Sequence, residues 1–95
     1  MNITELERKV FNVIIDFCVD YPEADIKDLS DITSMSENSV KGVVGSLVKK
    51  GLVSTGEDIR GFNIKFKTIN PIIQGEAVGF MCDMFDESEI ESFKL

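Results

Sequence analysis

The sequence predicts one α+β domain in which three helices precede a two-stranded antiparallel ribbon and a further helix. Up to Gly51, apolar residues recur at helical spacing behind residues that favour helix starts. After Gly51 the apolar period changes to two, which is the period of a strand. With 95 residues, of which 43% are hydrophobic, the chain suits one domain with a modest core and is too short for two.

The first predicted helix covers about residues 5–21. Thr4 and Glu7 form a Thr-x-x-Glu capping box at its start, and Pro22 ends it. The main apolar stripe consists of Leu6, Val10, Val13 or Ile14, Phe17 and Tyr21. Because Ile15 and Val19 lie off that stripe, the helix is apolar on more than one side. This pattern fits either a central helix packed by several neighbours or a dimer face.

The second and third helices form a predicted helix-turn-helix over about residues 25–50. Ala24 or Asp25 caps the short second helix, whose inward residues are Ile26, Leu29 and Ile32. Ser36 caps the third helix, which runs from Glu37 to about Lys50. Its inward stripe consists of Val40, Val43, Val44, Leu47 and Val48. Gly51 supplies the left-handed residue that ends it.

The ribbon, or wing, is predicted over about residues 52–69, with "LVST" and "FNIKFKTI" as strands and "GEDIRG" as the turn. One face of the second strand is apolar and the other carries Lys65 and Lys67. Asn70 and Pro71 favour a helix start, so we expect a C-terminal helix over about residues 71–86. The residues 86–95 form an acidic tail that we expect to fray or to extend this helix.

Composition argues against an enzyme. The chain has no histidine, no glycine-rich phosphate loop and no calcium-loop spacing among its acidic residues, so we predict no catalytic residue, no metal and no cofactor. No secretory signal or membrane-length apolar run is visible, which predicts a cytoplasmic protein without membrane contact. Cys18 and Cys82 both lie among apolar residues and are expected to be buried thiols, the alternative being a disulfide that joins them.

The net charge of −7 is unevenly distributed. The segment from Met35 to Asn70 has six basic and three acidic residues and is therefore +3, which leaves −10 for the rest of the chain. The chain is thus electrically polarised, and its positive part contains the third helix and the ribbon.

The predicted order of elements is that of a winged helix-turn-helix. The stretch "DIKDLSDITSMSENSVKGVVGSLVKKGLV", from Asp25 to Val53, resembles the helix-turn-helix of MarR-type bacterial and phage regulators. The features that match are "IKDL" in the second helix, the serine that starts the third, and the ending "LVKKGLV". The resemblance implies that the third helix enters the DNA major groove and that the wing contacts the backbone or minor groove. The DNA-binding residues it implies are Ser36, Asn38, Ser39, Lys41, Gly42, Gly45, Lys49, Arg60, Lys65 and Lys67.

Two outward positions of the third helix, Gly42 and Gly45, have no side chain. Each glycine costs a helix roughly 0.5–1 kcal/mol relative to alanine. Either another backbone approaches the helix closely at these positions, or a small protein tolerates a weak helix there.

Three functions are compatible with these patterns. The first is a DNA-binding transcriptional regulator that binds double-stranded DNA as a homodimer, with a dimer interface formed by Ile15, Val19, Phe80 and Met84. The second is a winged-helix protein–protein module, such as a small acidic adaptor or an inhibitor of a host nucleic-acid machine. The third is a ligand sensor whose pocket, lined by Phe17, Cys18, Phe80 and Met84, lies between the first and last helices.

Overall fold

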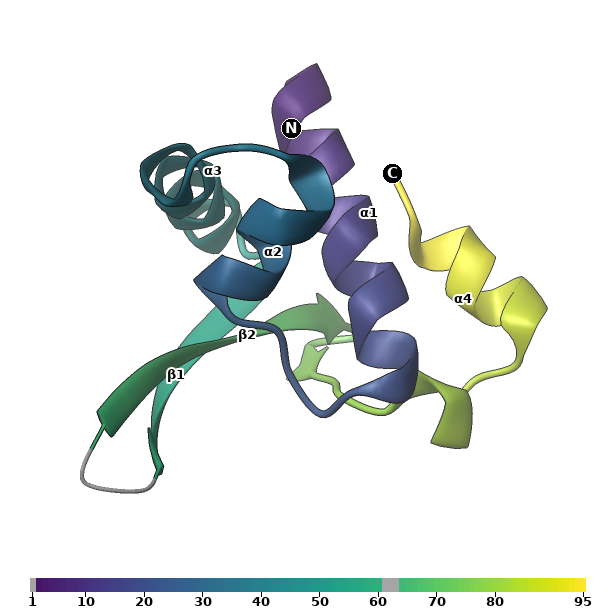
Figure 1. The fold of residues 1–95 in the computed structure, drawn as a ribbon. Helices are drawn as coiled ribbons and strands as arrows, with labels where there is room; N and C mark the ends of the chain where they lie inside the picture. Colours follow the sequence, from purple (N-terminus) through teal and green to yellow (C-terminus); the bar gives the residue numbers. More distant parts are fainter. Residues whose placement is uncertain (1, 61–63) are drawn as a thin grey trace.

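The computed structural model describes residues 2–60 and 64–95, and the side chains of these except 58–60 and 64–66. Over this part the chain is α+β, with four α-helices, one short 3₁₀ helix and a three-stranded antiparallel sheet of order β1-β2-β3 (Figure 1). The helices of this part are all too short or too polar to cross a membrane.

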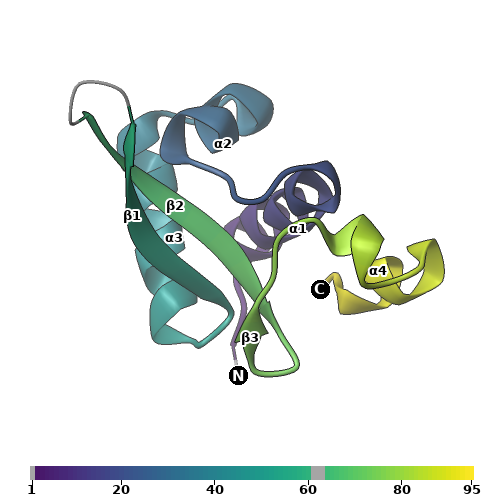
Figure 2. The same cartoon turned by 90° about the horizontal axis from the view of Figure 1, so that it is seen from below.

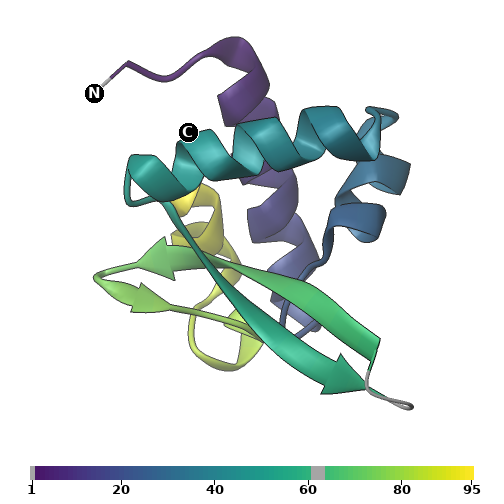
Figure 3. The ribbon, with the colours of Figure 1, turned by 90° about the vertical axis from the view of Figure 1, so that its left-hand side faces the viewer.

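Helix α1 (Glu5–Asp20) is the central element of the fold. Figures 1 and 3 show it between α3 (Glu37–Lys49) and α4 (Glu87–Phe93). The predicted capping box is present, because Thr4 N–H donates to Glu7 at 2.9 Å and Glu7 N–H donates to Thr4 at 3.1 Å. Ile15 is fully buried, as are Val10 and Ile14 of the main stripe, whereas Leu6 and Tyr21 near the two ends of the helix are 45% and 55% exposed. Of the two explanations for its broad apolar surface, packing by several neighbours is therefore the one that accounts for Ile15.

The helix-turn-helix segment forms as the capping residues predict. Asp25 caps α2 (Ile26–Thr33), and Ser36 accepts a hydrogen bond from Ser39 N–H at the start of α3. Gly51 ends α3 with φ +73°, and the next amide, Leu52 N–H, closes the turn onto Leu47 O. Two predicted inward residues are wrong: Ile32 is 53% exposed and Val48 is 39% exposed. On each helix the buried stripe is narrower than the set of apolar residues in the sequence, and these two residues lie at its edge.

Strands β1 (Val53–Arg60) and β2 (Ile64–Ile73) pair antiparallel, from Val53 opposite Pro71 to Arg60 opposite Ile64. Both strands extend beyond their predicted ends, because "GEDIR" continues β1 and "NPII" continues β2. We call this pair the β1–β2 ribbon. A β-bridge between Ala24 and Ile69 joins its base to the loop after α1. Ile69 N–H donates to Ala24 O at 2.8 Å, and Ala24 N–H donates to Ile69 O at 2.9 Å.

The helix predicted over residues 71–86 is wrong. The alternation of buried residues through Ile69, Pro71 and Ile73 continues the strand instead. Pro71 fits there because its C=O accepts from Val78 N–H while the neighbouring Ile72 N–H supplies the bond to Leu52 O. Asn70 caps nothing; its side-chain amide donates to Pro22 O at 2.7 Å and to Val78 O at 3.2 Å.

The chain after β2 contains three short elements where one long helix was expected. β3 (Glu76–Ala77) pairs with the end of β2 at the base of the ribbon (Figure 2), and the 3₁₀ helix η1 (Met81–Asp83) packs against α1. The acidic tail then contains α4, which starts at Asp86 with a reciprocal capping box to Glu89. The expectation of fraying or of a helix continuing from residue 71 is therefore wrong for this segment.

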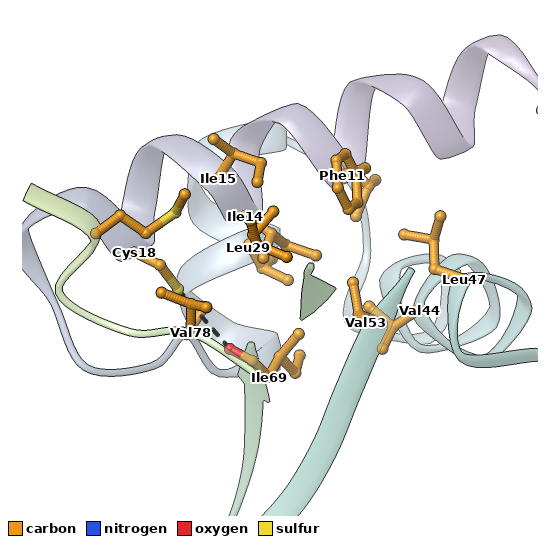
Figure 4. Packing of buried hydrophobic residues seen from close by; sticks show 14 of the residues in the cluster. Phe11, Ile14, Ile15, Cys18, Leu29, Val44, Leu47, Val53, Ile69 and Val78 are labelled. Carbon is orange, nitrogen blue, oxygen red and sulfur yellow. Dashed lines mark hydrogen bonds between the residues drawn. The ribbon is translucent and has the colours of Figure 1, made fainter. Parts of the chain in front are cut away.

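The core lies between α1, α2, α3 and the base of the ribbon. Figure 4 shows Ile14, Leu29, Val53 and Ile69 meeting from four elements, and each is at most 1% exposed. Cys18 packs into the same cluster, where its thiol faces Ile69 O at 4.0 Å. The expectation of a buried thiol is thus correct for Cys18, but Cys82 in η1 is exposed.

Candidate nucleic-acid interface

The outward face of α3 is open along its whole length. Its predicted DNA-binding residues Ser36, Asn38, Ser39, Lys41, Gly42, Gly45 and Lys49 are all exposed. The Ser36 and Ser39 hydroxyls bond each other at 2.9 Å at the start of the helix. The buried residues Val40, Val44 and Leu47 hold the opposite side of α3 in the core. The inner side of the helix is therefore fixed by packing, while its outer side has no partner within the described chain.

Gly42 and Gly45 have no packing role in this chain. A Cβ atom placed on either glycine meets nothing within 4 Å. By contrast, a Cβ atom on Gly79 would collide with the backbone of Pro22. The absence of side chains on α3 is therefore not imposed by anything inside the described part of the molecule.

A groove of about 240 Å³ separates α3 from the β1–β2 ribbon. Figure 3 shows α3 lying across the ribbon on this side of the molecule. Lys41 and Lys49 on α3 and Lys67 on β2 line the groove, and Gly45 and Val48 form part of its wall. The remaining lining residues are Ile26, Val44 and Thr55. Lysines from a helix and a strand thus surround one depression.

The sequence pattern predicted the lysines of the groove but not its apolar wall. Val48 was assigned to the core, because nothing in the sequence distinguishes it from its neighbour Leu47. Thr55 was missed because the strand face it shares with Ile69 is fixed only by the ribbon register. Glu57 lies opposite Lys67 in that register, which places one carboxylate close to the groove lysines. The side chains of Arg60 and Lys65 lie outside the described residues.

One lysine of the positive segment is already neutralised. Lys50 Nζ lies 2.7 Å from both carboxylate oxygens of Glu7 and 2.6 Å from Asn2 O. Ser46 Oγ also donates to Glu7 Oε2 at 2.7 Å. The Lys50 ammonium, with the Thr4 N–H and the Ser46 hydroxyl, lowers the pKa of the Glu7 carboxyl from 4.5 to about 2. Lys50 therefore joins α3 to α1 and adds little charge to the groove.

One of the four residues predicted to form a dimer interface does not reach the surface. Ile15 is fully buried, so it cannot contribute without unfolding; Val19 is half-buried. Phe80 and Met84 are 44% and 59% exposed. Ile15 is thus a wrong assignment, because α1 is packed by β2 and η1 as well as by α2 and α3, and Ile15 is fully buried.

A second pocket, of about 460 Å³, lies between α1 and α4. Its position agrees with the sensor pocket suggested from the sequence, but none of the four predicted lining residues contributes. Phe17 stacks on Tyr21 with ring centroids 4.7 Å apart, and Cys18 lies in the core. The lining consists of Asp16, Val19, Cys82, Phe85, Asp86, Glu87, Ile90 and Glu91.

The two pockets differ in the chemical groups that line them. Across residues 2–60 and 64–95, His, Cys, Asp and Glu side chains do not gather in a group that could hold a metal ion. The groove offers ammonium groups and a glycine surface, while the α1–α4 pocket offers carboxylates over an apolar floor. Comparison with known proteins finds no matching family model, no matching curated protein and no matching solved structure.

Proposed function

We propose that the chain is a DNA-binding transcriptional regulator of the winged helix-turn-helix type. α3 lies in the major groove, and the β1–β2 ribbon, as the wing, contacts the adjacent backbone or minor groove. One observation carries the proposal: the outward face of α3 has an open glycine surface beside a groove with three lysines. The resemblance of residues 25–53 to MarR-type regulators supports the same assignment.

The glycines suit close contact with the sugar-phosphate backbone. With no side chain at Gly42 or Gly45, a phosphate group can approach the helix surface, and Lys41, Lys49 and Lys67 can neutralise it. The α3 helix carries no arginine, which is the residue that most often makes paired hydrogen bonds to guanine. The affinity therefore comes chiefly from phosphate contacts, with Asn38 and Ser39 available for base edges.

The first test is a titration with random duplex DNA over a range of salt concentrations. Phosphate contacts release counterions, so binding weakens steeply as salt rises. Lys41→Ala, Lys49→Ala and Lys67→Ala should each reduce the slope of log K against log salt by about 0.9. Lys9→Ala is the matched control, because Lys9 is an exposed lysine on α1 outside the groove. Equal slopes for all four variants and the unchanged protein would rule out the groove as the DNA contact.

A second test separates helix stability from DNA contact. Leucine is a better helix former than glycine by roughly 0.5–1 kcal/mol, and the space above Gly45 is open, so Gly45→Leu should fold more stably. The same side chain would keep a phosphate away from the helix and weaken DNA binding. A Gly45→Leu protein with undiminished DNA affinity would contradict close approach at this position.

A further inference from the structure

The face of the molecule formed by α1, η1 and α4 combines an apolar floor with an acidic rim. Val19, Phe85 and Ile90 line the apolar part of its 460 Å³ pocket. Four carboxylates line the same pocket, from Asp16, Asp86, Glu87 and Glu91. Lys94 bonds two of them, Asp16 at 2.7 Å and Glu91 at 2.9 Å. Asp86 caps α4, so Glu87 is the rim carboxylate that is most available to a partner.

Exposed apolar residues extend this surface beyond the pocket. Met84 precedes Phe85 in the chain and is 59% exposed, and Phe80 is 44% exposed. Phe80 N–H donates to Tyr21 O at 3.1 Å, which places η1 beside the exposed end of α1. By the α1–α4 face we mean the residues that line this pocket, with its four carboxylates, together with the exposed Tyr21, Phe80 and Met84 of the adjoining segments.

The backbone at Phe80 is held in a strained conformation. Phe80 has φ 47° and ψ 52°, a left-handed region that a bulky residue rarely adopts. The preceding Gly79 passes so close to Pro22 that any side chain there would collide with its backbone. Strain of this kind persists only where the surroundings enforce it, and it is concentrated at functional positions. Here the strained residue is Phe80 itself, whose aromatic side chain remains partly exposed to solvent.

The charge on this face determines what can cover it. In a symmetric dimer the same patch would meet itself, so acidic side chains would face acidic side chains, which is unfavourable. A membrane surface that carries anionic lipids would be repelled for the same reason. A partner that brings positive charge at the rim and apolar side chains to the floor satisfies both parts of the face.

We propose that the α1–α4 face binds a basic amphipathic helix of a partner protein. Its apolar side chains would enter the pocket over Val19, Phe85 and Ile90, and its lysine or arginine side chains would pair with rim carboxylates such as Glu87. Figure 1 shows α4 on the opposite side of α1 from α3, so this site is separate from the proposed DNA surface. The protein could therefore hold DNA and a basic partner at once.

The reactivity of the Cys82 thiol can report whether a partner occupies the pocket. It is exposed and lines the pocket, whereas Cys18 is buried in the core. Burial raises the pKa of the Cys18 thiol to about 12, so only Cys82 should react with N-ethylmaleimide in the folded protein. Desolvation, with the carboxylates of Asp83 and Asp20, also raises the pKa of the Cys82 thiol, which lowers its thiolate fraction. Mass spectrometry follows its alkylation over time.

The test uses three synthetic peptides of about 14 residues, or roughly four helical turns. The first has leucines at i, i+3, i+4 and i+7 and lysines elsewhere. The second replaces each lysine with glutamate, and the third scatters the same leucines and lysines. At a concentration of about ten times its Kd, the first peptide should slow Cys82 alkylation about tenfold. The other two should give no protection at that concentration.

Matched variants locate the contact. Glu87→Gln should weaken the lysine peptide about 2- to 5-fold, and Glu76→Gln, which removes the same charge on β3, should not. Met84→Ser should also weaken binding, whereas Ile32→Ser, a similarly exposed apolar position on α2, should not. All four positions are exposed, so the variants should fold, which circular dichroism checks.

Several outcomes overturn the proposal. Equal protection by the lysine and glutamate peptides, absence of protection, or equal weakening by variants and controls would each do so. A molecular mass that doubles with concentration, together with Cys82 protection in the absence of peptide, would assign the face to a second copy instead. DNA binding is measured in a separate titration. A failure of the proposed DNA-binding function would therefore leave the peptide results unchanged.

Discussion

Gly42 and Gly45 lie on consecutive turns of the open face of α3, at positions where helix formation gains nothing from a missing side chain. Because an added Cβ meets nothing within 4 Å at either site, the cost of each glycine is purely conformational. Glycine at these positions is unfavourable for the helix and is not required by packing. Its best explanation is that the surface of a binding partner must come close to α3. In our proposal that surface is the DNA backbone.

We expect Gly42→Ala and Gly45→Ala each to raise the free energy of unfolding by roughly 0.5–1 kcal/mol. Urea denaturation measures the change. Gly51→Ala is the contrasting variant, because φ +73° disfavours any side chain, and it should destabilise the protein. Equal effects at all three glycines would show that local backbone conformation does not control these positions.

The Glu7–Lys50 pair predicts how stability changes with pH. The pKa of Glu7 is about 2 in the folded protein against 4.5 ordinarily, so folding favours its charged form. That stabilisation is present above pH 4.5 and is lost as pH falls from 4.5 towards 2. Glu7→Gln should therefore be less stable than the unchanged protein at neutral pH, and the difference should shrink over this acid range.

Free energies of unfolding measured by denaturant titration at several pH values would check this expectation. Glu5→Gln is the control, since Glu5 is an exposed carboxylate in the same helical turn. If the Glu5 and Glu7 variants showed the same pH dependence, the buried ion pair could not be its source.

Side-chain contacts hold the short helix α4 together and join the end of the chain to α1. Ile90 is buried, and the Phe85 and Phe93 rings meet edge to face at 4.9 Å. The Asn12 side chain exchanges two hydrogen bonds with the backbone of Leu95, at 2.9 and 3.1 Å. A seven-residue helix is too short to be stable alone, so these contacts decide whether it forms.

Asn12→Ala should open α4 locally without destabilising the rest of the fold. Loss of two exposed hydrogen bonds should speed amide exchange in α4 about 3- to 10-fold, while exchange in α2 and α3 stays unchanged. Hydrogen exchange followed by mass spectrometry would measure this, with Lys9→Ala on the same helix as control. Uniformly faster exchange across the chain would mean that α4 unfolds only with the whole domain.

At the scale of the whole molecule, the charge polarity has a spatial counterpart. Helix α3, which carries the groove lysines Lys41 and Lys49, and helix α4, which carries acidic residues of the second pocket, lie on opposite sides of α1 (Figure 1). One side is suited to an anionic partner and the other to a cationic one. The net charge of −7 describes neither side, which is why it is a poor guide to the partners of this protein.

The predicted homodimer stays a prediction, and the charge distribution gives it a distinctive test. If two copies meet through Val19, Phe80 and Met84, their acidic rims come together and repel. Salt screens that repulsion, so the dimer fraction should rise between about 50 mM and about 500 mM salt, whereas DNA binding should fall. Sedimentation at both concentrations would measure it, and a dimer that dissociates in high salt would contradict association through this face.

The sequence alone determined the elements whose signals are local. The Thr4, Ser36 and Gly51 positions of α1 and α3 follow from capping chemistry, and the change of period after Gly51 places the ribbon, because these effects act within one helical turn or one strand. Lys41, Lys49 and Lys67 were predicted as surface cations for the same reason. The groove that brings them together was not, since it depends on how α3 packs over the ribbon.

Only the tertiary structure decided the segment after Ile69 and the face of α1 that it covers. Asn70-Pro71 has the local chemistry of a helix start, but pairing with Val53 and with β3 continues the strand. With that change the last helix, α4, forms within the acidic tail, and β2 and η1 both contact α1, on which Ile15 is fully buried. Hydrogen bonds and burial between residues distant in sequence outweighed a local preference of at most a few kcal/mol.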